Sequence, residues 1–541
     1  MSYVRPAPLT CEALFAAAAA AALAAVLLWA GPPGNDLAAH VYQRTLFLEH
    51  GFVLWNNFWY AGRYSFVTYS VLYYPLSALL GIKVLALASV TVAALAFAVV
   101  VGREWGRAVR WSSRTFAVLW AGTVLSAAFP FALGAALALL ALWALQEERR
   151  SRFAVLVVLT LAASPLAFVF LVVVLLGLAL VRRPPRTAFL VPAAIIVTAA
   201  LGELALMRLF PDGGRFPYHL NQLVPTVGFC ALGALMSCAA RGARPLLGVF
   251  LVYVTVCLVL FAVPTELGSN IERLRYAAIP LALLAVSLAG WRPLKIALPL
   301  LVLAGYWNVQ PLIANYQRAA ADPASEAVYW QPAVRYLHRH LTPSFRVEAV
   351  DTLEHWPAAY LPERGVPIVR GWYRQNDFPG NELLYDEELG PLTYRRWLRS
   401  HGVRYVVLSD APPDYSSRAE AALLRSGASG LQPVFRTRHL TIYELARATP
   451  VVTGPAPAKV RALSATAMLI EVGAPGSYRV AVRFSPYWRT YRGCVSKEPD
   501  AMTRLTAFRR GTINLSFNVN VHRSLEALTG FTPRESCAFA R

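Results

Sequence analysis

Hydrophobic residues form long uncharged runs over residues 1–315, and short arginine-rich segments separate these runs. Clear examples are the runs over 14–29, 84–102 and 296–313. A helix needs ~20 consecutive apolar residues to cross the ~30 Å hydrocarbon core of a bilayer. The pattern therefore predicts a polytopic α-helical membrane domain.

The arginine-rich segments indicate how these helices are oriented, because cytoplasmic loops of membrane proteins are enriched in Lys and Arg. The segments lie at 103–114, 147–152, 182–186, 241–244 and 292–295. Counting crossings between them gives about eleven helices. We expect a multi-pass membrane protein, with its N-terminus in the cytoplasm and everything after residue 315 outside.

Two stretches depart from a simple crossing. The run 153–181 has basic flanks at both ends and is broken by Ser164-Pro165, which predicts two short or re-entrant helices. The run 65–81 is rich in tyrosine and contains Pro75, which suits a helix lying along the outer surface. This run falls within a predicted first external loop over 31–83. The predicted transmembrane domain, which includes that loop, covers 1–315.

The remainder of the chain is predicted to form two extracytoplasmic domains. Residues 316–448 alternate helical and strand patterns, which indicates a small α/β domain. Residues 449–541 show short alternating strands with Gly/Pro turns, which indicates a β-sandwich. Cys494 and Cys537 both fall in the sandwich, where the environment allows a disulfide, and we predict that they pair.

The amino-acid composition narrows the classes of function that the chain can have. The formal charge of +21 arises from 51 basic and 30 acidic residues, while charged residues make up only 15% of the chain. Orientation of helices and contact with anionic lipid head groups explain this charge better than nucleic-acid binding does. No Cys/His spacing suggests a metal site, and no phosphate-binding loop or dinucleotide fingerprint is present.

The sequence Gly34-Asn35-Asp36 follows the first predicted crossing, so Asp36 is the first carboxylate outside the membrane. The loop behind it is rich in aromatic residues and asparagine. Its candidate sugar-binding residues are Asn56, Asn57, Trp59 and Tyr73. Aromatic rings stack on sugar C–H faces and amides bond to hydroxyls, although an interfacial aromatic belt is an alternative explanation. Polar-aromatic clusters at 351–356 and 372–377 are weaker candidates for acceptor binding.

A first helix, then Gly-Asn-Asp36 at the start of a long external loop, then Tyr73-Tyr74-Pro75-Leu76 before the second crossing, resembles the GT-C superfamily. Its members are polytopic glycosyltransferases that use polyprenyl-phosphate sugars and carry an acidic residue early in the first external loop. The resemblance implies such a donor, and an acceptor that is a cell-envelope glycan, lipid or protein. This chain has a single acid where some members have two, and its motif reads Asp36-x-x-x-His40, as in bacterial GT-C-like membrane proteins.

An inverting transfer needs a base that takes the acceptor proton and cations that stabilise the leaving phosphate. Asp36 is the candidate base, although Asp before an apolar-periodic run is also a helix N-cap signal. His40 shares its helix face and could orient Asp36, contact the phosphate, complete a Mg²⁺ or Mn²⁺ site, or be structural. Glu203, inside the predicted crossing 187–210, is either a second acid or half of an ion pair between helices.

The candidates for the donor phosphate are basic or polar residues predicted to lie outside the membrane. They are Asn270, Arg273, Arg275 and Arg63. An arginine at an external helix end needs an anionic partner, which is either a phosphate or a nearby carboxylate such as Glu266 or Glu272. The rival hypothesis is a non-catalytic transporter or assembly factor for envelope polysaccharide. Only one broken helix and no internal repeat are visible, which favours the enzyme.

Overall fold

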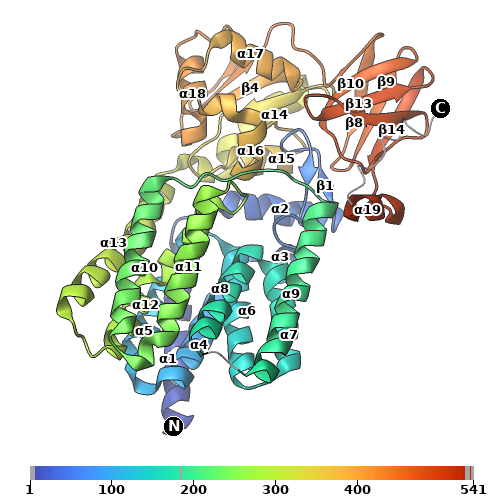
Figure 1. Ribbon diagram of the computed structural model, residues 1–541. Coiled ribbons are helices and arrows are strands. Elements are labelled where there is room, and N and C mark those ends of the chain that lie inside the picture. The colour runs from blue at the N-terminus through green and yellow to red at the C-terminus, as the bar shows by residue number, and fades with distance from the viewer. Residues whose placement is uncertain (1–5, 183–184, 530–536, 538–541) are drawn as a thin grey trace. The chain divides into compact units, whose positions relative to one another are not determined.

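The computed structural model describes residues 6–182, 185–529 and 537. The chain forms two compact units, each assembled from separate stretches of sequence (Figure 1). The first unit comprises 1–37, 69–204 and 215–321, and the second comprises 38–68, 205–214 and 322–541.

The first unit is helical. Its helices are α1 (Pro6–Ala30), α3 (Tyr73–Leu80), α4 (Ile82–Trp105), α5 (Arg110–Ala121), α6 (Phe129–Gln146), α7 (Arg150–Ala163), α8 (Pro165–Arg182), α9 (Arg186–Leu209), α10 (Leu220–Cys238), α11 (Arg244–Ala262), α12 (Ala278–Leu288) and α13 (Leu294–Ala320). The last residues of α9 belong to the second unit. Four 3₁₀ segments of the described residues join these helices: η1 (Gly106–Val109), η2 (Gly122–Ser126), η3 (Arg241–Ala243) and η4 (Gly268–Ala277).

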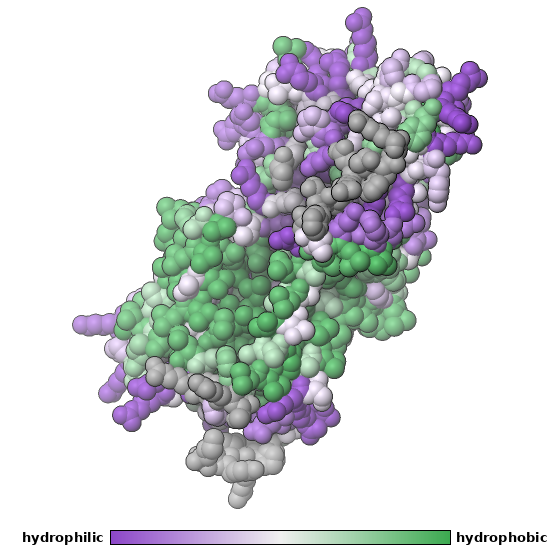
Figure 2. All heavy atoms as spheres, turned by 45° about the vertical axis from the view of Figure 1, so that its right-hand side comes forward, coloured by the Kyte–Doolittle hydropathy of each residue, from purple (hydrophilic) through white to green (hydrophobic). Residues whose placement is uncertain are grey.

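Within the described residues, eight helical segments are long and apolar enough to cross a membrane. Figure 2 shows hydrophobic side chains over the visible face of these helices, as expected where side chains face lipid rather than water. The prediction of a multi-pass membrane protein is confirmed. The number of crossings, about eleven, and their orientation stay predictions.

The predicted break at Ser164-Pro165 is present, because α7 ends at Ala163 and α8 begins at Pro165. Proline has no N–H and leaves carbonyls of the preceding turn without an intrahelical donor. The backbone N–H groups of Val71 and Leu72 both donate to the carbonyl of Ala162, each at 2.9 Å. The segment just before α3 therefore supplies hydrogen-bond donors to a carbonyl at the break. Backbone polar groups within a membrane need such partners, because no water is present there.

The eight-residue helix α3 forms the helical part of the run 65–81, whose placement the sequence left open. At 1.5 Å per residue it is ~12 Å long and cannot cross a ~30 Å hydrocarbon core. Its length agrees with a segment that does not span the membrane.

The second unit contains an α/β part. Its four-stranded sheet has the order β3-β4-β6-β5, with β3 (Arg346–Ala349) parallel to β4 (Val403–Ser409) and the pairs of β6 (Leu440–Glu444) with β4 and β5 (Gln432–Arg436) antiparallel. The accompanying helices are α14 (Ala327–His340), α15 (Pro357–Glu363), α16 (Arg374–Asn381), α17 (Pro391–Ser400) and α18 (Arg418–Arg425). Val403, Val406 and Leu408 bury β4 in its core.

The C-terminal part is β-rich, as predicted. Two four-stranded sheets have the orders β12-β13-β10-β7 and β11-β14-β9-β8. The strands are β7 (Val452–Thr453), β8 (Ala458–Leu463), β9 (Ala467–Val472), β10 (Gly476–Arg483), β11 (Trp488–Arg489), β12 (Gly493–Lys497), β13 (Met502–Ala507) and β14 (Gly511–Phe517), followed by α19 (Val521–Leu528). Both sheets contribute to one core, with Val480 and Leu505 from one and Ile470 and Leu515 from the other. A disulfide joins Cys494 to Cys537, the pair proposed from the sequence.

The compact units divide the N-terminal region differently from the predicted loop 31–83. Most of α2 (Leu37–His50), with β1 (Trp55–Asn56) and β2 (Arg63–Tyr64), belongs to the second unit. The reason is a set of backbone bonds to C-terminal residues: Asn57 N–H donates to Ala465 O at 2.9 Å, and Ile368 N–H donates to Phe58 O at 3.1 Å. The three predicted domains with boundaries at 315 and 448 stay predictions.

Candidate active site

The stretch Gly34–Asp36 is held against the turn formed by η2 in the first unit. The backbone N–H groups of Asn35 and Asp36 donate to the carbonyls of Leu125 and Ser126, at 3.3 and 3.1 Å. A Cβ on Gly34 would lie 2.5 Å from a carbonyl oxygen of the same turn. Glycine therefore permits the close approach that sets the position of Asp36.

Asp36 forms an ion pair with Arg273, with Oδ2 and Nη2 3.8 Å apart. Arg273 lies on η4, its Nη2 is 3.5 Å from Asn270 Oδ1, and its guanidinium is 5.3 Å from the centre of the Phe131 ring. The side chains of Asp36 and Arg273 are 22% and 16% exposed. Three residues proposed from the sequence, Asp36, Asn270 and Arg273, therefore lie together and remain partly open to a ligand.

A second cation near this pair was missed by the sequence analysis. Asn35 Nδ2 donates to Asn315 Oδ1 at 3.0 Å, and Arg318 Nη2 donates to the same oxygen at 2.7 Å. Both partners lie on the last turns of α13. The exposed Arg318 is thus linked through Asn315 to the residue next to Asp36. The signal in the sequence was an arginine at an external helix end, the criterion that selected Arg273.

The other candidates of the first unit are arranged differently. The guanidinium of Arg275 lies 5.6 Å from the ring centre of Tyr276. Glu272, one of the alternative partners of Arg273, instead accepts a hydrogen bond from Thr226 Oγ1 at 3.3 Å. Glu203 is half-buried on α9, and a neighbouring charge acting on it is another carboxylate, Glu266. Both roles proposed for Glu203, a second acid or half of an ion pair, stay predictions.

His40 and Arg63 belong to the second unit. His40 is fully buried, with its ring 6.4 Å from that of Trp372. Arg63 is 4% exposed, forms an ion pair of 2.5 Å with Asp212, and stacks 3.7 Å above the ring of Tyr373. Its guanidinium therefore has a carboxylate partner, which is the alternative to a phosphate that the sequence left open.

The four candidates for sugar binding are all buried at 0% exposure. Asn57 is bonded through both ends of its amide, accepting from Trp55 Nε1 at 2.8 Å and donating to Ser464 O at 2.9 Å. Trp59 Nε1 donates to Ala358 O at 2.8 Å. Asn56 Oδ1 accepts from the Tyr42 hydroxyl at 3.2 Å. These asparagine and tryptophan side chains therefore pack the second unit, and Tyr73 is equally buried in the first.

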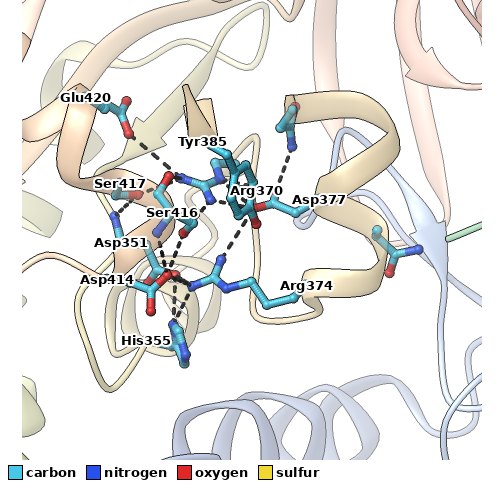
Figure 3. A network of polar contacts seen from close by, with 12 residues as sticks. Asp351, His355, Arg370, Arg374, Asp377, Tyr385, Asp414, Ser416, Ser417 and Glu420 are labelled. Atoms are coloured by element: carbon cyan, nitrogen blue, oxygen red, sulfur yellow. Dashed lines mark hydrogen bonds and ion pairs between the residues drawn. The ribbon is translucent and has the colours of Figure 1, made fainter. Parts of the chain in front are cut away.

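The weaker acceptor candidates near 351 and 374 form a buried charge network in the α/β part (Figure 3). Arg374 Nη2 lies 2.5 Å from Asp351 and 2.8 Å from Asp414, and its Nη1 lies 3.3 Å from Asp377. Arg370 forms a bidentate contact with Asp377. Figure 3 shows both guanidinium groups pointing into the middle of the carboxylates. The charges compensate one another, so the network is structural.

This charge compensation lowers the pKa values of two carboxylates in the network. Burial acts to raise the pKa of Asp351, but the charges of His355 and Arg374 outweigh it and lower the pKa to about 2. The pKa of Asp414 is likewise lowered, because Arg374 and His355 outweigh its burial. Both carboxylates are therefore ionised at neutral pH and depend on Arg374.

A divalent metal was left possible by the sequence, and the residues around Asp36 do not fit one. The Asp36 carboxylate already faces a guanidinium at 3.8 Å, which would repel a cation. In the part of the chain that the structure describes, no group of three or more His, Cys, Asp or Glu side chains is placed to hold a metal ion. The pair of Asp36 and Arg273 therefore suits an anionic ligand better than a metal ion.

Fold and site together define a polytopic membrane protein with an acid–arginine pair beyond the end of its first helix. No protein-family model and no curated protein matches the chain. Solved structures do show similarity. Arabinofuranosyltransferase AftD from Mycobacteria has a TM-score of 0.48 and 16% identity, over 88% of this chain and 43% of AftD. The chain thus spans less than half the length of AftD.

ArnT from Cupriavidus metallidurans is also similar. Its apo structure has a TM-score of 0.40 and 12% identity, over 80% of this chain and 97% of ArnT. Its structure bound to undecaprenyl phosphate has a TM-score of 0.36 and 11% identity, over 82% and 99%. AftD and ArnT are GT-C glycosyltransferases, the superfamily that the sequence resembles. At these scores the similarity assigns no role to any residue of this chain.

Proposed function

We propose that this protein is a membrane glycosyltransferase that moves a sugar from a polyprenyl-phosphate donor to an extracytoplasmic cell-envelope acceptor. The observation that carries the proposal is the pair of Asp36 and Arg273, 3.8 Å apart and partly exposed in a polytopic membrane protein. A carboxylate beside a cation is what the two halves of such a transfer require.

In the proposed reaction Asp36 is the general base. Its carboxylate takes the proton of an acceptor hydroxyl while the hydroxyl oxygen attacks the anomeric carbon of the donor sugar. The bond between that carbon and the phosphate oxygen breaks, and the electron pair leaves with the polyprenyl phosphate. The configuration of the anomeric carbon is inverted.

Arg273 and Arg318 are proposed to bind the phosphate. In the structure Arg273 interacts with Asp36 at a distance long for a charge-assisted hydrogen bond. A phosphate between Arg273 and Arg318 would draw Arg273 toward itself and free the Asp36 carboxylate for the proton. Donor binding would then prepare the base, and the same guanidinium groups would stabilise the negative charge of the leaving phosphate.

The decisive test is Asp36→Asn, which keeps the shape of the side chain and removes the base. We expect release of polyprenyl phosphate from a panel of lipid-linked sugars to fall by about 10²–10⁴-fold. The matched control is Asp386→Asn, an exposed aspartate of the α/β part. If Asp36→Asn inserts into the membrane at normal levels and both donor turnover and envelope glycans are unchanged, Asp36 is not the base.

A second test separates phosphate binding from chemistry. Arg273→Gln should weaken binding of undecaprenyl phosphate to the purified protein, and Arg273→Lys should retain part of it because the charge remains. Arg292→Gln, which removes an exposed arginine of the segment 292–295, is the control. Equal affinity of wild type and Arg273→Gln would remove Arg273 from the donor site.

The same measurements address the rival hypothesis of a transporter or assembly factor. Such a protein would bind a lipid-linked sugar without consuming it, and Asp36→Asn would leave turnover at the background level of the wild type. The sequence, with one predicted broken helix and no visible internal repeat, favours the enzyme over a transporter built from repeats.

A further inference from the structure

A cavity of about 620 Å³ lies at the start of α1, the end of that helix far from Asp36. It is lined by α1, the last turns of α4, η1 and the first turn of α5. Its lining residues are Leu9, Cys11, Glu12, Phe15, Ala98, Gly102, Gly106, Arg107, Val109, Arg110 and Arg114. Volumes of this size are typical of sites that hold a small molecule or a head group.

The cavity carries a positive charge. Three arginines line it against one carboxylate, Glu12. Arg114 satisfies that carboxylate with two hydrogen bonds, from Nε at 3.0 Å and Nη2 at 3.2 Å. Arg110 forms a longer ion pair with it, at 3.7 Å, and its side chain is 64% exposed. Arg107 is exposed as well, so an anion can reach the guanidinium groups of Arg107 and Arg110.

Other residues that line the cavity are apolar. Phe15 packs under the guanidinium of Arg114, with 4.8 Å between the charge and the ring centre. Ala98 and Gly102 form the α4 side. These residues belong to segments that are candidate membrane spans, Leu9–Ala30 and Ile82–Ser126. The cavity thus combines a cationic rim with an apolar wall at the end of a membrane helix bundle.

We propose that this cavity binds an acidic phospholipid of the leaflet that faces the 103–114 segment. The phosphate of the head group would contact Arg107 and Arg110, and the upper acyl chain would lie against Phe15 and Ala98. Charge complementarity selects an acidic lipid over a zwitterionic one, because each arginine near a membrane surface favours an anionic lipid by about fivefold in affinity. The site is independent of Asp36 and of the proposed transferase activity.

Helix orientation by positive charge explains arginines in this segment but does not explain a cavity between them. The segment 147–152 provides the contrast. It also contains exposed arginines, Arg150 and Arg152, yet neither lines this cavity.

The first experiment uses cysteines already present in the protein. Cys11 lines the cavity and is exposed, while Cys238 is exposed at the end of α10. We expect phosphatidylglycerol to slow maleimide modification of Cys11 by about fivefold or more relative to Cys238 in the detergent-purified full chain, and phosphatidylcholine with the same acyl chains to have no such effect. Equal protection by both lipids would overturn the proposal. Equal protection by inorganic phosphate alone would show an anion site in place of a lipid site.

The second experiment tests the two arginines directly. Native mass spectrometry of the full chain in an equimolar mixture of the two lipids should show preferential retention of phosphatidylglycerol. Arg107→Gln/Arg110→Gln should reduce that preference by about 25-fold. The control Arg150→Gln/Arg152→Gln has the same change in charge and should retain it. An unchanged preference in the cavity variant, or an equal loss in the control, would contradict a built site.

Discussion

The substitution Arg374→Met tests the buried network of the α/β part. Methionine is close to arginine in length but has no charge. The change removes the contacts of Arg374 with Asp351, Asp414 and Asp377 and leaves these carboxylates buried.

The three carboxylates keep different partners after the substitution, so they lose unequal amounts of charge compensation. Asp351 retains the His355 ring at 2.8 Å, and Asp377 retains Arg370. Asp414 keeps hydrogen bonds from the backbone and hydroxyl of Ser416, at 3.0 and 2.6 Å, which are not full charges. Removing one partner of a buried ion pair costs ~3–5 kcal/mol. Because 1 kcal/mol shifts the Tm of a domain of 150–250 residues by about 2–4 °C, we expect a fall of roughly 6–20 °C.

The assay is thermal unfolding of the purified full chain in detergent, followed by tryptophan fluorescence and by limited proteolysis of the C-terminal part. Arg425→Met is the control, because Arg425 is exposed on α18. Surface substitutions of this kind change stability by about 0.5 kcal/mol or less. The double variant Arg374→Met/Asp414→Asn should recover part of the loss, since it neutralises the carboxylate left with the weakest compensation.

Two results would refute this reasoning. A Tm of Arg374→Met equal to that of Arg425→Met would show that the network contributes little. A double variant no more stable than Arg374→Met would show that the stranded charge of Asp414 is not the source of the cost.

Three further predictions follow from other contacts. Asp351 has a pKa of about 2 in the folded state against an ordinary value of 3.8. It therefore stabilises the fold above pH ~4, and this stabilisation decreases by ~2 kcal/mol as the pH falls toward 2. Asp351→Asn should flatten the acid denaturation curve in that window. Gly34→Val should lower donor turnover, because a Cβ 2.5 Å from a carbonyl displaces Asp36; wild-type turnover would contradict that placement. Intact mass after alkylation of the denatured, unreduced protein should show at most four labelled cysteines, because Cys494 and Cys537 stay protected until reduction; more than four labels before reduction would rule out the disulfide.

Much of the helical unit could be predicted because its signals are local. An uncharged run indicates a helix wherever it lies, and a proline ends one, as at Pro165. Counting arginines placed Asp36 and Arg273 on the same side of the membrane, and in the structure they form an ion pair. That count limits a residue to one side and gives no distance within it.

What the sequence did not reveal depends on residues far apart in the chain. Asn35 and Asn315 are 280 positions apart, so nothing local linked Arg318 to the candidate site. The burial of the aromatic loop could not be predicted for the same reason. Trp59 and Asn57 find their partners 299 and 407 positions downstream, and a pattern typical of an exposed sugar-binding surface is instead the interior of a domain.

The burial of this N-terminal segment has a consequence for the synthesis of the protein. Asn57 bonds to Ser464, so residues 38–68 cannot complete their packing until about 400 further residues have been made. At ~5–20 residues per second, the segment spends roughly 20–80 s with Trp55, Trp59 and Tyr60 unprotected. During biogenesis a chaperone or the membrane surface must therefore cover this stretch. A chain truncated before residue 464 would leave the stretch permanently accessible to quality-control proteases.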